Sequence, residues 1–146
     1  PDRFPARIEM RLLSAEPMVY VCRTDHHLAR RDQVGLTELA TEDLIGFPAE
    51  FGLRRLVDDA FAAAGVAPQM PYEVSASYSI AADLVRNGLG TIFMPGSEAR
   101  RYPNLRAVAV HPPLVWPVYL ASAGPSIIGP ASAKLAEMLV AASPAT

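Results

Sequence analysis

Residues 44–64 read LIGFPAEFGLRRLVDDAFAAA, an apolar run, a turn and a longer segment with helical periodicity. The apolar run ends at Phe47 and predicts a strand that Pro48 stops. After Gly52, apolar residues recur at spacings of three and four, which predicts an amphipathic helix that Gly65 ends. The apolar positions of this helix are Leu53, Leu56, Val57, Ala60, Phe61 and Ala64. A strand joined by a short turn to a helix is typical of α/β domains.

The sequence on either side continues this alternation. Polar and apolar residues alternate from Arg7 to Leu13, which predicts a half-buried strand with Ile8, Met10 and Leu12 on its apolar face. Pro17 predicts a break before the continuous apolar run Met18 to Cys22, a second and more deeply buried strand.

Further elements follow toward the C-terminus. Ser77 predicts the N-cap of a helix that Gly88 closes, and Pro130 lies near the first turn of a last amphipathic helix. The apolar face of that last helix comprises Leu135, Met138, Leu139 and Ala142. The remaining predictions are a helical turn at 36–40, a short helix at 97–101, and strands at 72–74, 91–94, 105–110 and 118–121. Strands alternating with helices of about ten residues predict a mainly parallel sheet covered on both faces.

Composition narrows the function. Hydrophobic residues make up 51% and charged residues 19%, which is enough apolar surface for a folded domain. The net charge of -2 and the lack of a basic cluster argue against direct binding to a phosphate backbone. A single cysteine, Cys22, cannot form an internal disulfide and is interpreted as a buried apolar residue. With no apolar run near ~20 residues, we expect no membrane span and a cytoplasmic protein.

Four stretches then stand in a recognisable order. They are EPMVYVCRTDHHLARRDQVGLTELATEDLIGFP (16–48), GLRRLVDDAFAAAGVAPQMPYEV (52–74), LVRNGLGTIFMP (84–95) and HPPLVWPVYLAS (111–122). No single stretch is diagnostic, but together they resemble the effector-binding domain of LysR-type transcription regulators. The resemblance runs from about Ile8 to Ala142.

The resemblance implies a type 2 periplasmic-binding-protein-like α/β fold with two lobes. It assigns residues 1–24 to the remaining strands of lobe one and the crossover, 25–116 to lobe two, and 117–146 to the return strand and final helix of lobe one. Lobe two is then complete and lobe one partial. The strands of lobe one would need another chain, a further segment or unusual packing to protect their edges.

The resemblance also implies a function without catalysis. Such a domain binds a small-molecule effector between its lobes, here an organic acid or an aromatic compound. DNA would be bound only through a helix-turn-helix head absent from this sequence, in a homodimer or homotetramer. A solute-binding protein of a transport system shares the fold and is the alternative. An enzyme on the same fold would require a reactive residue in the cleft, and the sequence offers none.

Two turns that lead into helices are the predicted effector contacts, because free amides at a helix start attract an anion. The effector-binding candidates are Phe47, Pro48, Ala49, Glu50, Phe51, Ser77 and Tyr78. The aromatic members could enclose an apolar body, whereas Glu50 would disfavour an anion unless it points outward. The same residues could instead be ordinary core and capping residues. Arg23 and Thr24 lie where the crossover strand leaves lobe one and are the predicted hinge.

Neither a metal nor a cofactor is expected. The doublet His26-His27 lies in a polar loop, and no His, Cys and Asp spacing elsewhere completes a ligand set. Asp58-Asp59 could pass for paired carboxylates, but both lie on the solvent face of the helix, where Arg54 and Arg55 pair with them at i, i+4. No Ser occupies a G-x-S-x-G elbow, so no catalytic residue is predicted.

Overall fold

A computed structural model describes residues 8–75, 77–123 and 129–143 of the chain. The chain divides into two compact units: unit 1 comprises Pro1–Ala15 and Pro117–Thr146, and unit 2 comprises Glu16–Trp116. Arg7, where the first strand was expected to begin, lies outside the described residues.

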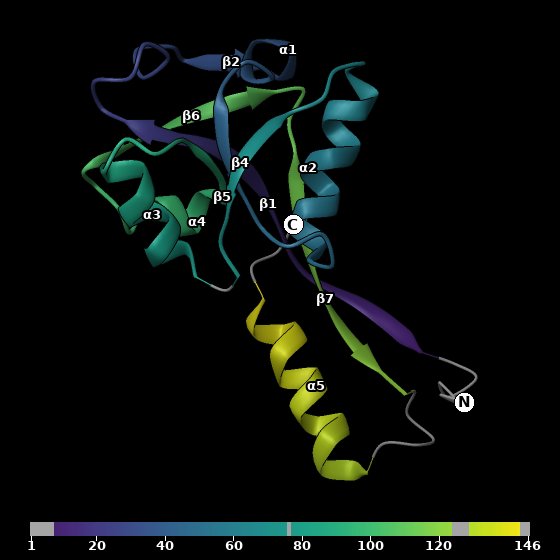
Figure 1. Cartoon of the computed structure of the whole chain (residues 1–146). Helices are drawn as coiled ribbons and strands as arrows, with labels where there is room; N and C mark the ends of the chain where they lie inside the picture. Colours follow the sequence, from purple (N-terminus) through teal and green to yellow (C-terminus); the bar gives the residue numbers. More distant parts are fainter. Residues whose placement is uncertain (1–7, 76, 124–128, 144–146) are drawn as a thin grey trace. The chain divides into compact units, whose positions relative to one another are not determined.

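The strands of unit 2 build around β1 (Glu9–Arg23), which pairs antiparallel with both β5 (Ile92–Pro95) and β6 (Leu105–His111). On the far side of β6 lies β2 (Gln33–Gly35), parallel to it (Figure 1). The predictions did not include β2, whose three residues are too short to show a periodicity.

A second pair of strands extends the same arrangement. Here β3 (Asp43–Gly46) runs parallel to β4 (Gln69–Glu73), and a parallel bridge between Leu44 and Thr91 joins β3 to the start of β5. Because β1 is antiparallel to both β5 and β6, those two strands share one direction, and β2, β3 and β4 follow it. The mainly parallel sheet is therefore confirmed, with β1 as the exception.

The two predicted long helices of unit 2 are present with the expected ends. The helix α2 (Gly52–Ala63) is followed by Gly65 with φ 73°, and α3 (Tyr78–Arg86) by Gly88 with φ 76°. Both glycines occupy the left-handed conformation that commonly terminates helices. The short helices are α1 (Leu36–Leu39), which packs against α2, and α4 (Gly96–Ala99), which packs with α3 on β5 and β6 (Figure 1).

The hydrophobic core belongs to unit 2. Its largest fully buried side chains include Tyr20, Phe61 and Met18, from β1 and α2. Ring pairs tie the layers together, since Phe93 on β5 meets Phe61 at 6.1 Å and Tyr20 at 6.2 Å, each edge to face. Cys22 is fully buried as predicted, and this burial raises the pKa of its thiol to about 11.

The strand break predicted at Pro17 is wrong, because β1 is one strand of 15 residues. Pairing of β1 with β5 begins at Met18, one residue after Pro17. A proline can continue a strand where no ladder hydrogen bond requires its missing N–H. Pro17 is exposed at such a position.

Unit 1 contains parts of β1 and β7 (Val115–Ser122), which pair with each other, and α5 (Pro130–Ala142). The predicted helix is confirmed, but its apolar face is exposed, with Leu135 at 57% and Met138 at 59% exposure. The predicted burial of Ile8, Met10 and Leu12 is likewise wrong, since each is at least 40% exposed. Within the described part of unit 1, too few elements exist to cover these side chains. Among the described residues, no helix is both long enough and apolar enough to span a membrane.

Candidate functional site

The predicted effector contacts gather at one edge of the unit 2 sheet. Because β3, β4 and β5 are parallel, their carboxyl ends share an edge, and the turns after β3 and β4 lead directly into α2 and α3. The antiparallel strand β1 begins its passage through unit 2 at this edge, at Glu16. Ligands of open α/β sheets commonly bind at the carboxyl ends of the strands.

The aromatic residues of the two turns form one cluster. Phe47 stacks on Phe51 with ring centroids 6.2 Å apart, and it meets Tyr78 edge to face at 5.3 Å. Phe47 is buried, whereas Phe51 is 40% exposed. The structure therefore brings together side chains 31 positions apart in sequence, with Phe47 as the fixed centre and Phe51 and Tyr78 as the accessible rings.

The two helix starts differ in their capping. At α2 the N-cap residue is Phe51, which offers no side-chain acceptor to the first amides of the helix. At α3 the N-cap residue is Ser77, whose hydroxyl oxygen accepts a hydrogen bond from the Ser79 N–H at 3.2 Å. The predicted cap is thus confirmed, and α2 is the helix start without a side-chain cap.

Two acidic groups accompany the cluster and were missed by the sequence analysis. Burial, followed by the charges of Glu98 and Glu16, raises the pKa of Tyr78 to about 12, so its hydroxyl remains a donor at physiological pH. Glu16 accepts hydrogen bonds from the Ser97 N–H at 2.9 Å and the Ser97 hydroxyl at 2.8 Å. The carboxylate of Glu16 is thereby held at the start of α4. Its sequence position carries no signal of this, because the contact spans 81 residues.

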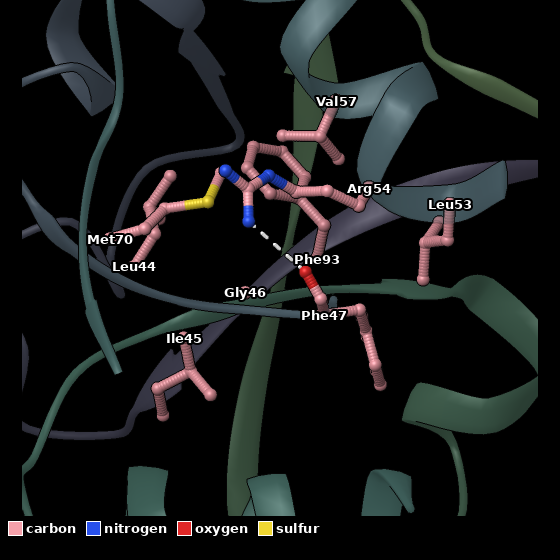
Figure 2. A pocket seen from close by; sticks show the side chains of 9 residues that line it. All are labelled: Leu44, Ile45, Gly46, Phe47, Leu53, Arg54, Val57, Met70 and Phe93. Atoms are coloured by element: carbon pink, nitrogen blue, oxygen red, sulfur yellow. Dashed lines mark hydrogen bonds between the residues drawn. The ribbon is translucent and has the colours of Figure 1, made fainter. Parts of the chain in front are cut away.

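Arg54 on α2 holds the Phe47–Phe51 turn in place through a side-chain hydrogen bond. The sequence did not predict this role. Figure 2 shows its side chain reaching from α2 past Met70 toward Phe47, where Nη1 donates to the Phe47 carbonyl at 3.1 Å. Its Nε donates to Asp58 at 2.9 Å, which confirms the expected i, i+4 pair. The cavity around it holds about 20 Å³, room for a single water at most. This cavity is too small for a metabolite. Arg54 therefore connects α2 to the turn and does not line a binding pocket.

Replacing Arg54 with Met should lower the free energy of unfolding by about 1–3 kcal/mol, because the half-buried Phe47 carbonyl loses its charged donor. Urea denaturation measures this change. Arg55→Met is the matched control: Arg55 is exposed on the same helix, and its replacement should stay within ~0.5 kcal/mol. Equal effects at the two positions would contradict the role given to Arg54.

The other predicted residues lie apart from the cluster or at its rim. Ala49 and Glu50 are exposed in the turn, and Pro48 accepts a hydrogen bond at its carbonyl from the Phe51 N–H at 2.9 Å. Arg23 ends β1, and Thr24 follows it in an exposed turn, at the sheet edge opposite the Phe47 turn. Arg23 donates to Asp25 at 2.8 Å. The hinge role of these two residues stays a prediction.

Comparisons with known proteins give the family. Residues 2–144 match the family described as the LysR substrate binding domain. The chain is 30% identical over 138 residues to the uncharacterized HTH-type transcriptional regulator YbhD of Escherichia coli strain K12, covering 91% of this chain and 43% of that protein. To the regulator YybE of Bacillus subtilis strain 168 it is 35% identical over 108 residues, covering 74% of this chain and 35% of that protein. The chain thus spans less than half the length of these curated relatives.

Solved structures agree with this match. The effector-binding domain of QuiR in complex with shikimate superposes with a TM-score of 0.83 at 27% identity, covering 93% of this chain and 65% of that chain. The regulatory domain of CcmR from Synechocystis PCC6803, in complex with 2-PG, superposes with a TM-score of 0.84 at 18% identity, covering 98% and 70%. The fold is that of a type 2 periplasmic-binding-protein-like sensor. This chain belongs to the LysR substrate-binding domain family.

Proposed function

We propose that this chain senses a small organic acid for a LysR-type transcription regulator, and that the Phe47–Phe51 turn and the start of α3 supply the contacts from unit 2. One observation carries the proposal. An aromatic cluster lies between two helix starts at the carboxyl edge of the sheet, and the start of α2 has no side-chain cap.

The chemistry of this surface favours a carboxylate joined to a small ring. Uncapped amides at the start of α2 carry partial positive charge and can bind a carboxylate without a lysine or arginine. The exposed face of Phe51 offers apolar contact, and the protonated Tyr78 hydroxyl offers a hydrogen-bond donor. Shikimate, the compound bound to the QuiR effector domain, is itself a carboxylic acid and is the first compound to test.

In the whole protein, effector binding would act on DNA through a helix-turn-helix head outside this sequence. The relatives YbhD and YybE are HTH-type transcriptional regulators, which favours regulation over the transport alternative. The effector shifts the population of the regulator only if it binds its conformations with unequal affinity. We place this regulator in the cytoplasm as a homodimer or homotetramer and expect no catalysis from it.

Phe51→Ala should weaken effector binding at least about tenfold, because an exposed aromatic wall at the centre of a small-molecule contact supplies much of the affinity. The measurement is a thermal-shift titration with shikimate and a panel of small organic acids, in which a bound acid raises the unfolding temperature. Ser77→Ala tests the second helix start in the same assay.

Tyr72→Ala is the matched control, since Tyr72 on β4 is 42% exposed and Phe51 40%, and Tyr72 takes no part in the aromatic cluster. The control should keep the affinity of the unaltered protein. If Phe51→Ala and Ser77→Ala both respond to the acids as strongly as the unaltered protein, the effector site does not lie at these turns. A full panel without any response would remove organic acids as the effector class.

A further inference from the structure

The histidine doublet gains a third partner in the fold. His26 and His27 lie in the turn after β1, and Glu42 immediately precedes β3. Glu42 contacts both rings: one carboxylate oxygen is 3.3 Å from His26 Nε2 and the other is 2.8 Å from His27 Nε2. Sequence spacing alone did not complete a ligand set, because Glu42 is 15 positions beyond His27.

We propose that His26, His27 and Glu42 bind one divalent transition-metal ion of the zinc class. Two imidazole nitrogens and a carboxylate form a common ligand set for such ions. Their three ligand atoms already lie within 4.8 Å of one another. Ligands about 2.0–2.1 Å from a tetrahedral zinc stand roughly 3.3 Å apart, so only small side-chain movements are needed.

The backbone holds these ligands in place. The His26 N–H donates to the Arg23 carbonyl at 3.1 Å, and the Ala29 N–H donates to the His26 carbonyl at 2.9 Å. Leu28 and Ala29 are buried and anchor the turn to the core. The Glu42 side chain is only 13% exposed. Fixed ligands reduce the ordering cost of binding an ion.

An open coordination position is also available. A hollow of about 240 Å³ is lined by His26 and Glu42 together with Arg23, Thr41, Asp43 and the segment 88–91. It leaves room beside the ion for water or a small ligand, as in zinc sites with three protein ligands.

Metal binding would break one hydrogen bond that the His26 ring accepts. The Leu28 N–H donates to His26 Nδ1 at 3.3 Å, so Nε2 is the nitrogen that carries the proton of the neutral ring. Coordination through Nε2 moves this proton to Nδ1 and removes the hydrogen bond from Leu28. We therefore expect the amide resonance of Leu28 to shift when zinc is added, an effect that nonspecific binding elsewhere would not produce.

The decisive experiment is a calorimetric titration of the tag-free protein with zinc chloride alone, without any organic acid. The unaltered protein should bind one ion per chain, and both His27→Gln and Glu42→Gln should weaken binding at least about tenfold. His27→Gln carries the test, because the His27 side chain is 65% exposed and its replacement should leave folding intact. Circular dichroism checks that fold.

The third histidine supplies the control. His111 ends β6, is exposed and lies outside this cluster, so His111→Gln should bind zinc like the unaltered protein. Equal affinity in His27→Gln and the unaltered protein, or no saturable binding at millimolar zinc, would overturn the proposal. The site lies at the sheet edge opposite the aromatic cluster, so Phe51→Ala should leave zinc binding unchanged. The zinc titration and the organic-acid titration therefore test the metal site and the effector site independently.

Discussion

Phe61→Ala is expected to lower the free energy of unfolding by about 3–5 kcal/mol. Phe61 is fully buried on α2, and its ring packs edge to face on Phe93 of β5. Truncation removes a large apolar side chain at the joint between helix and sheet and leaves a cavity that rigid neighbours can fill only in part. Because domains of this size are commonly stable by about 5–15 kcal/mol, the loss is a large share of the total.

Urea denaturation followed by circular dichroism measures this loss as a fall in the midpoint at constant slope. Phe51→Ala, at the N-cap of the same helix, serves as the comparison. The Phe51 ring is 40% exposed, so its removal should cost less than about 1 kcal/mol. A similar loss for both phenylalanines would mean that Phe51 is a core residue, and it would also weaken the proposed effector site.

Gly90→Ala is expected to cost about 2–4 kcal/mol for a different reason, backbone geometry. Gly90 has φ 157°, and a Cβ atom there would stand 2.7 Å from the Asp43 carbonyl oxygen. That oxygen cannot easily move, since it accepts hydrogen bonds from the Thr91 N–H at 2.9 Å and the Thr91 hydroxyl at 3.2 Å. The substitution therefore strains the bridge that joins β3 to β5.

Gly35→Ala is the control for Gly90→Ala, since the nearest atom to an added Cβ is 3.9 Å away. It should change stability by less than ~1 kcal/mol in the same urea titration. Hydrogen exchange offers a second measurement, because the Thr91 amide should exchange faster in Gly90→Ala. Unchanged exchange and an unchanged midpoint would show that the bridge tolerates a side chain.

Local signals in the sequence predicted most of the secondary structure of unit 2. The 3.6-residue periodicity of α2, the Ser77 cap and the closing glycines 65 and 88 act within a few residues of the chain. The alternation of strands and helices also predicted a mainly parallel sheet. These features depend on neighbouring residues, so a single sequence is sufficient to read them.

The errors arise where distant segments decide the outcome. Pro17 is compatible with a strand only because β1 needs no hydrogen bond from it, which depends on where β5 begins to pair. Similarly, the apolar faces of β1 and α5 predicted burial, but burial depends on which elements are present to cover them. Periodicity identifies an apolar face and cannot tell what packs on it.

The same distinction between local signals and long-range contacts applies to the candidate site. Helix starts at Gly52 and Tyr78 were predictable, and with them the approach of Phe47, Phe51 and Tyr78. The contributions of Arg54 and Glu16 were not, because each depends on a side-chain contact set by the fold. The Glu42 contact with both histidines belongs to this second group.

The division of the chain into units has a consequence for biosynthesis. Unit 2 is one uninterrupted stretch, whereas unit 1 combines two stretches that lie on either side of it in the sequence. A ribosome therefore completes residues 16–116 before it makes any of the return segment. At about 5–20 residues per second, the first half of β1 waits roughly 5 to 20 s for its β7 neighbour. During that interval the backbone of this half-strand lacks its β7 partner and is open to pairing with other nascent chains.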